Sequence, residues 1–368
     1  SENSYRRLPG DGGTFAFPHT ERTPCDEETT MPLYAACDLH SNNTVLAVLD
    51  EAGTVQLRQR VPNDLGLIDA ALAPFRGQLH GVAVESTYNA YWLLDGLSQA
   101  GYPAQMVNTL AVPQYAGLKQ ADDHSDARHL ANLMRLGLLP TAYIYPKAQR
   151  GLRDLLRRRM LLVQQSVRLL QSVQGYWARA TGQRLSANAF RHLTRPQLAE
   201  TFTDPDELFA VANLLQCWLS LQQRIHAIED WLAKDTRQRK DLAALRTIPG
   251  VGIILGLTVA LESGQVERFD HVGQYTSYCR LVPADKVSNG KRKGTGNRKC
   301  GNRYLAWAWI EAANFAIRFS PPVKTWYQRN AARKPRVVAL KAVAHKLARA
   351  GFHLMRDGGR FEVHRAFA

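Results

Sequence analysis

The sequence predicts a mixed α/β domain near the N-terminus, then a helical segment, then a mostly helical and basic C-terminal domain. Its 368 residues exceed the size of one compact core. Short β-rich runs fill residues 31 to 146, helical periodicity follows over residues 147 to 240, and residues 241 to 368 hold most of the excess positive charge. Residues 1 to 30 are polar and rich in Gly and Pro, so we expect a flexible tail there.

The α/β prediction rests on the order of the elements after residue 31. Three successive strand signals with turn residues between them predict an antiparallel group, and alternating strand and helix follow. The predicted elements are strands at 34–38, 44–49, 55–61 and 81–84, a helix at 88–100 and a strand at 104–107. Such an order forms a mixed sheet and is typical of a ribonuclease-H-like fold.

In the helical segment, apolar residues recur at three- and four-residue steps from Leu152 to Val173 and again from Leu208 to Leu232. This spacing predicts two long amphipathic helices that form a helical hairpin or a coiled coil. The apolar stripe fits packing within the chain and packing against a second copy about equally well, so a homo-oligomer is one of two interpretations.

The third segment opens with a Pro-Gly-Val-Gly turn at residues 249–252, ahead of an apolar helix predicted at 253–261. This turn resembles the hairpin of helix-hairpin-helix modules, whose backbone amides face a phosphate at a helix N-terminus. A Gly-rich turn can also be only a turn.

The net charge of +15 predicts a polyanionic partner or an acidic membrane surface. Between Lys286 and Arg356 there are seventeen Lys and Arg residues and a single acid, Glu311, so the rest of the chain is close to neutral. Aromatic residues lie among these cations, which favours nucleic acid over a merely solvated face. The cations singled out as nucleic-acid contacts are Lys286, Lys291, Arg292, Lys293, Arg298, Lys299 and Arg303.

The five cysteines are odd in number and show no paired metal-ligand spacing, which is typical of reduced cytosolic thiols. No apolar run reaches membrane-spanning length, and no charged-then-apolar leader opens the sequence. We therefore expect a prokaryotic cytoplasmic protein associated with the nucleoid.

Four carboxylates stand out by position. Asp38 ends the first predicted strand, Glu85 follows the fourth, and Asp123 and Asp126 share one face of a predicted helix. Hard oxygen ligands of this kind suit Mg²⁺, and a pair of such ions can clamp a phosphodiester. The alternative is that these acids are helix caps and solvated strand ends. His124 and His129 lack zinc-ligand spacing and are interpreted as helix-surface residues.

A second candidate is Ser288, in a Gly-rich and cation-rich loop within residues 281–298. A hydroxyl there can lie beside a phosphate that backbone amides and cations hold, and with activation it can act as a nucleophile. The alternative is that Ser288-Asn289-Gly290 is only a surface turn.

Taken in order, these motifs resemble the DEDD-type transposases of insertion-sequence family one-hundred-ten. These transposases are related to the Piv and MooV invertases. The resemblance covers residues 32 to about 356. The basic loop after Ser288 and residues 306–309 are similar to the eleven-eleven subgroup. The residues that carry the resemblance are Asp38, Glu85, 123–127, 248–252, 288–290 and 301–303.

The resemblance implies an N-terminal domain similar to the RuvC Holliday-junction resolvase, in which Asp38, Glu85, Asp123 and Asp126 bind Mg²⁺. Asp123 is chosen over Asp122 because it precedes Asp126 by the family's three-residue step. The resemblance also implies a nucleophilic Ser288 in a C-terminal transposase domain, and a bridge RNA that pairs with donor and target DNA. We expect a phosphoserine-DNA intermediate in a dimer or tetramer.

Two other functions fit the same residues. A RuvC-like nuclease would use metal-bound water and leave Ser288 a bystander. A non-catalytic nucleic-acid-binding protein would use the acids only as caps, and its binding would depend on salt but not on Mg²⁺.

Overall fold

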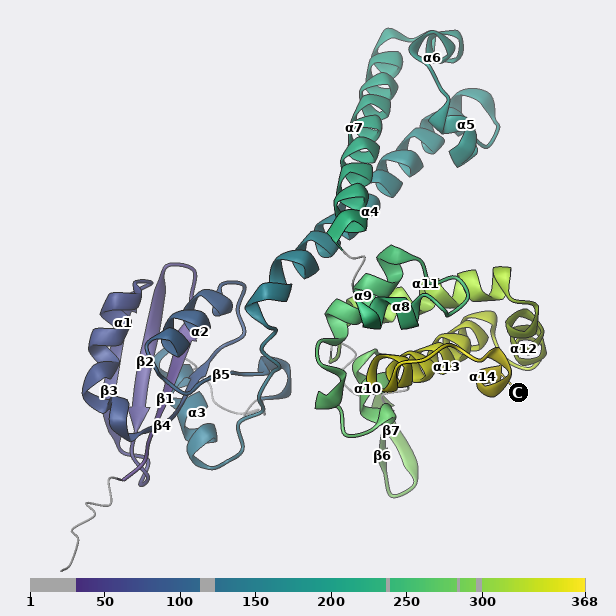
Figure 1. Cartoon of the computed structure of the whole chain (residues 1–368). Coiled ribbons are helices and arrows are strands. Elements are labelled where there is room, and N and C mark those ends of the chain that lie inside the picture. The colour runs from purple at the N-terminus through teal and green to yellow at the C-terminus, as the bar shows by residue number, and fades with distance from the viewer. Residues whose placement is uncertain (1–30, 113–122, 236–238, 283–284, 296–299, 368) are drawn as a thin grey trace, which may run out of the picture. The chain divides into compact units, whose positions relative to one another are not determined.

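The computed structural model describes residues 31–112, 123–235, 239–282, 285–295 and 300–367 (Figure 1). The chain forms two compact units: the first runs to Ala142, apart from Leu110–Val112, and the second comprises Tyr143–Ala368 with that short segment. No helix among the described residues is long and apolar enough to cross a membrane. The described cysteines, Cys37, Cys217, Cys279 and Cys300, are free.

The first unit is built on one five-stranded sheet with the strand order β3-β2-β1-β4-β5. β1, β2 and β3 pair antiparallel, whereas β4 pairs parallel with β1 and β5 parallel with β4. The strands are β1 Leu33–Leu39, β2 Asn43–Leu49, β3 Val55–Pro62, β4 Leu79–Val84 and β5 Ala104–Met106. This mixed sheet, followed by a mostly helical remainder, confirms the predicted order of an α/β domain and a mostly helical region, and it is consistent with a ribonuclease-H-like domain.

The central strands β1, β2 and β4 are buried along nearly their whole length because helices pack on the sheet. The helix α3 (Asp123–Arg135) packs on β1 and β2, with Ala127 buried against Val45 and Ala47. The helix α2 (Ala90–Gln99) lies against β4 and β5.

One helix of this unit was not predicted. α1 (Leu65–Leu72) begins at Asp64, whose side chain accepts hydrogen bonds from the amides of Gly66 and Leu67. A glycine in the first turn and the lack of a polar face hide the helical period in the sequence.

In the second unit, two long helices pack against each other along their length (Figure 1). α4 spans Lys147–Thr181 and α7 spans Pro205–Asp235. Two short helices, α5 (Ala187–Arg191) and α6 (Arg195–Thr201), connect them at the far end, where Phe190 is buried.

The remainder of the second unit is a helical core around Trp309, which is fully buried and donates from Nε1 to the hydroxyl of Tyr275 at 3.2 Å. Gly351 lies against the indole, where a Cβ atom would stand 2.3 Å from the ring. The helices are α8 Lys240–Leu245, α9 Ile253–Ser263, α10 Val272–Tyr278, α11 Arg303–Phe319, α12 Pro321–Ala331, α13 Arg336–Asp357 and α14 Val363–Phe367. One two-stranded hairpin, β6 (Asp285–Ser288) with β7 (Lys291–Thr295), extends from this core.

Candidate active site

Asp38 and Glu85 lie side by side because their strands run parallel. β1 pairs with β4 so that Cys37 is opposite Val84, and the next residue of each strand is one of the two acids. The amide of Glu85 donates to the carbonyl of Cys37 at 3.2 Å, which fixes the backbone at this edge. Asp38 is 3% exposed, so one carboxylate is buried at the sheet edge.

Asp126, on α3, lies close enough to Glu85 to act on its charge. Burial raises the pKa of Glu85 to about 8, together with a hydrogen bond to Asp38 and the charges of Asp38 and Asp126. The structure therefore places Asp38 and Glu85 next to each other, with Asp126 within electrostatic range of Glu85. Asp123 is the first residue of α3, but its side chain lies outside the described part of the chain.

The cluster has the donor chemistry of a divalent-cation site. Its carboxylate oxygens are hard ligands, and their mutual repulsion is what a bound cation would relieve. Among the side chains that the structure describes, no three or more His, Cys, Asp or Glu residues are already arranged as a ligand set. The residues thus fit a cation in charge and chemistry.

His40 belongs to the same edge and was missed in the sequence. Its Nε2 atom lies 3.3 Å from Oδ2 of Asp38, and its carbonyl accepts hydrogen bonds from Nδ2 of Asn63 and of Asn89, each at 3.0 Å. His40 comes directly after β1, two residues from Asp38, and residues two apart in an extended chain face the same side, so this step was a usable signal.

Ser288 is the last residue of β6, in the second unit. It pairs with Lys291, and the turn between them, Asn289 with φ 51° and Gly290 with φ 71°, has the left-handed backbone of a type I′ hairpin. The side chain of Ser288 lies outside what the structure describes. The acids and the serine thus belong to different units.

The predicted cations fall on and near this hairpin. Lys291 and Lys293 are exposed, and Arg303, also exposed, opens α11 and donates from Nη2 to the hydroxyl of Tyr304 at 2.9 Å. The remaining predicted cations lie outside the described part of the chain, as side chains (Lys286 and Arg292) or entirely (Arg298 and Lys299).

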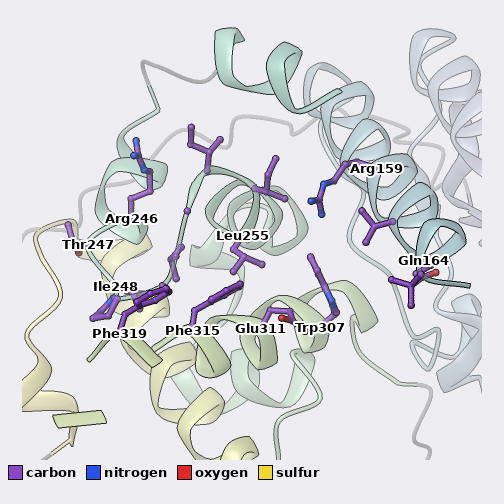
Figure 2. A pocket seen from close by; sticks show the side chains of 18 of the residues that line it. Arg159, Gln164, Arg246, Thr247, Ile248, Leu255, Trp307, Glu311, Phe315 and Phe319 are labelled. Atoms are coloured by element: carbon purple, nitrogen blue, oxygen red, sulfur yellow. The ribbon is translucent and has the colours of Figure 1, made fainter. Parts of the chain in front are cut away.

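The Pro-Gly-Val-Gly turn lines a cleft of about 1350 Å³ in the second unit (Figure 2). α11 supplies a row at four-residue spacing along one side, Trp307, Glu311, Phe315 and Phe319, and α4 supplies Arg159 and Gln164. Gly252 precedes α9 without a side-chain cap, so the first amides of α9 are not satisfied by such a cap.

A mixed sheet with acids at two neighbouring strand ends, followed by a mostly helical basic region, is consistent with the class of DEDD-type transposases. Residues 35–178 match the transposase model DEDD_Tnp_IS110, and residues 242–328 match the model described as Transposase IS116/IS110/IS902 family. The chain belongs to this IS116/IS110/IS902 transposase family. The four predicted acids fall within the first match and Ser288 within the second.

Several curated transposases are similar to the chain. It is 24% identical over 269 residues to "Putative transposase y4qE" of Sinorhizobium fredii, covering 71% of this chain and 65% of the relative. It is 24% identical to the transposase for insertion sequence element IS1111A of Coxiella burnetii, covering 59% and 60%. It is 22% identical to that for IS1328 of Yersinia enterocolitica, covering 76% and 85%. The first two matches span less than two thirds of each relative.

Proposed function

We propose that this chain is a DNA transposase that cuts and rejoins DNA through a serine nucleophile assisted by a carboxylate metal site. The observation that supports the proposal is the adjacency of Asp38 and Glu85 at the ends of two parallel strands, where the charge of Asp126 on α3 also acts on Glu85. Membership in a transposase family supports DNA as the substrate.

Asp38, Glu85 and Asp126, with Asp123 as the fourth ligand, would hold Mg²⁺. When bound, such an ion neutralises phosphate charge and lowers the pKa of a coordinated hydroxyl. The buried Asp38 keeps its place at the sheet edge through β1, and Nε2 of His40 lies 3.3 Å from its Oδ2 atom. Because these ligands are built on rigid elements, they can fix the position of a scissile phosphate.

The proposed chemistry at Ser288 is a transesterification. The serine oxygen forms a bond to phosphorus, the bond from phosphorus to a sugar oxygen breaks, and that sugar oxygen takes up the proton that the serine loses. The phosphoserine keeps the energy of the phosphodiester. A sugar hydroxyl of another strand then attacks it, forms the new phosphodiester and releases the serine, without ATP.

We further propose that the exposed cations of the β6–β7 hairpin contact the DNA backbone, and that a bridge RNA selects donor and target DNA. Support for the cations is their exposure beyond the Asn289-Gly290 turn. The guide RNA, an oligomeric assembly and a place on the nucleoid rest on the family resemblance alone.

The deciding experiment uses labelled DNA that carries the ends of the protein's mobile element, with Mg²⁺ and co-purifying RNA. After denaturation, we expect label attached to wild type and none attached to Ser288→Ala. Cut DNA without attached protein in both samples would instead establish a nuclease that uses water. Salt-sensitive binding without any cutting, indifferent to Mg²⁺ and to Asp38→Ala, would indicate a non-catalytic binding protein.

A further inference from the structure

The segment that carries the serine hairpin, residues 281–300, leaves and rejoins the helical core at one point, which we call the base of the hairpin. The chain leaves the helical core at Tyr278 and Arg280 and returns at Gly301 and Asn302. The amide of Asn302 donates to the carbonyl of Tyr278 at 2.6 Å, and the guanidinium of Arg280 donates to the carbonyl of Gly301 from Nε at 3.0 Å and Nη2 at 2.7 Å.

The backbone at this point has little freedom. Gly301 has φ +86°, and a Cβ atom there would lie 2.5 Å from the carbonyl oxygen of Tyr278. Arg280 also has a positive φ, 58°, which is uncommon for a residue with a side chain. Such strain persists only where surrounding contacts hold it, so the base of the hairpin depends on its neighbours.

Asn302 connects this base to the interior with both ends of its amide. Its Oδ1 atom accepts from the amides of Tyr304 at 2.8 Å and Leu305 at 3.2 Å, which caps α11. Its Nδ2 atom donates to Oε2 of Glu262 at 2.8 Å. A cap needs only an acceptor, so the donor side of the asparagine serves a second purpose.

Glu262 is the buried acid that receives this donor. It is 1% exposed, near the end of α9, and Arg157 of α4 grips it with Nε at 2.6 Å and Nη2 at 2.8 Å. Nε of Arg153 lies 3.5 Å from the same carboxylate, and the hydroxyl of Tyr145 donates to the carbonyl of Glu262 at 2.6 Å. A buried carboxylate is tolerated when it is paired in this way.

We propose that Glu262 is a positioning residue for the serine: through Asn302 it fixes the base of the β6–β7 hairpin and ties that base to the long helix α4. The inference rests on the proposed function, because it assigns the hairpin to the reaction. Because Glu262 is buried, its proposed role runs through Asn302 and not through contact with DNA. A carboxylate has two acceptor oxygens, so Glu262 can accept from both nitrogens of the Arg157 guanidinium and from the Asn302 amide at once. This explains an acid at a fully buried position.

The test separates the two functions of Asn302, which are capping α11 and donating a hydrogen bond to Glu262. Asn302→Ser keeps a good cap and removes the donor to Glu262, whereas Asn302→Ala removes both. We expect Asn302→Ser in the full-length chain to slow formation of the covalent protein–DNA product by roughly ten- to hundredfold, with DNA affinity unchanged. Amide hydrogen exchange over residues 285–295 should speed up by about tenfold.

Glu262→Gln should reproduce both effects, and the double variant with Asn302→Ser should be no worse than Glu262→Gln alone, because the two residues act in one series. The matched control is Glu229→Gln. Glu229 also pairs with an arginine of α4, Arg159, at 2.6 Å, but it has no contact with the hairpin base among those described. We expect this control to leave hairpin exchange and product formation at wild-type values.

Hydrogen exchange makes the two proposals separable. If Ser288→Ala still gives covalent product, the serine chemistry is wrong, yet faster hairpin exchange in Asn302→Ser would still support the positioning role. If Ser288→Ala is inactive while Asn302→Ser and Glu262→Gln leave both exchange and rate unchanged, Glu262 does not position the hairpin. A parallel decrease of thermal stability and DNA affinity in Asn302→Ser would also overturn the proposal in favour of a general structural role.

Discussion

Asp38 and Glu85 lie at positions where burying their charges lowers the stability of the fold. Both leave the sheet at a buried edge, and the pKa of Glu85 rises to about 8 because burial, Asp38 and Asp126 all oppose its charge. A fold under selection for stability alone would carry a neutral residue here. Sites that sacrifice stability in this way are commonly sites of function.

Glu85→Gln should therefore stabilise the first unit when no metal is present. At pH 7 the wild-type protein must either protonate Glu85 or tolerate its charge, and glutamine avoids both, so we expect a gain of about 1–2 kcal/mol. Thermal unfolding without divalent ions measures this gain.

The same experiment with Mg²⁺ tests the ligand role. Wild type should gain in melting temperature on adding Mg²⁺, because a ligand that binds only the folded state stabilises it, and Glu85→Gln should gain less. Glu51→Gln, at an exposed acid of the same unit, is the control and should behave as wild type. Equal gains for Glu85→Gln and wild type would remove Glu85 from the metal site.

At the scale of elements, the turn before α9 contains two glycines whose surroundings differ. Gly250 has φ +86°, and a Cβ atom there would lie 2.4 Å from Cβ of Phe315 and 2.9 Å from the amide nitrogen of Ala316. Gly252, two residues on, has nothing within 4 Å of such an atom. The two glycines of one motif thus serve different purposes.

Gly250→Ala should destabilise the second unit by about 2–3 kcal/mol, because strain in the backbone adds to a collision with the backbone of α11. Gly252→Ala should cost less than about 1 kcal/mol. Denaturant unfolding of the two variants measures the difference. Equal stabilities would mean that the turn does not pack on α11.

How far the sequence predicts each element depends on where its signal lies. The strand of Asp38 follows from a local apolar run with turn residues after it. Asn289-Gly290 is a local signal for a hairpin, but the low β-propensity of its basic, Gly-containing strands obscures that signal. The ion pair of Arg157 with Glu262 joins residues 105 apart in the sequence, and no local pattern announces it. Such long-range contacts decide which buried acid has an ion-pair partner, and only the structure reveals them.

At the scale of the whole molecule, positive charge is uneven: the net charge is +15, and most of it lies between Lys286 and Arg356. Replacing Lys291, Arg292 and Lys293 together by alanine should weaken DNA binding and flatten its salt dependence by about 0.9 for each phosphate that the variant no longer neutralises. Affinities at several salt concentrations give the slope. Arg184 and Arg191, exposed outside the basic segment, provide a control pair, and an unchanged slope in the triple variant would mean that the hairpin faces solvent.

The acids and the serine lie in different compact units. Our hypothesis is that one active centre takes the acids from one protomer and the serine from another. Under this hypothesis, Asp126→Ala and Ser288→Ala proteins are each inactive alone, and mixing them restores covalent product, because some sites then combine an intact acid set with an intact serine. Mixtures that never exceed either variant alone would show that each protomer completes its own site.

The 35-residue helix α4 has the proportions of a lever. From Arg157, which holds Glu262, the helix continues for about 36 Å to Thr181. A tilt of about 10° would swing the far end through about 6 Å. Conversely, a displacement of a few ångströms at the far end of the helix would change its direction at Arg157 by only about 5°.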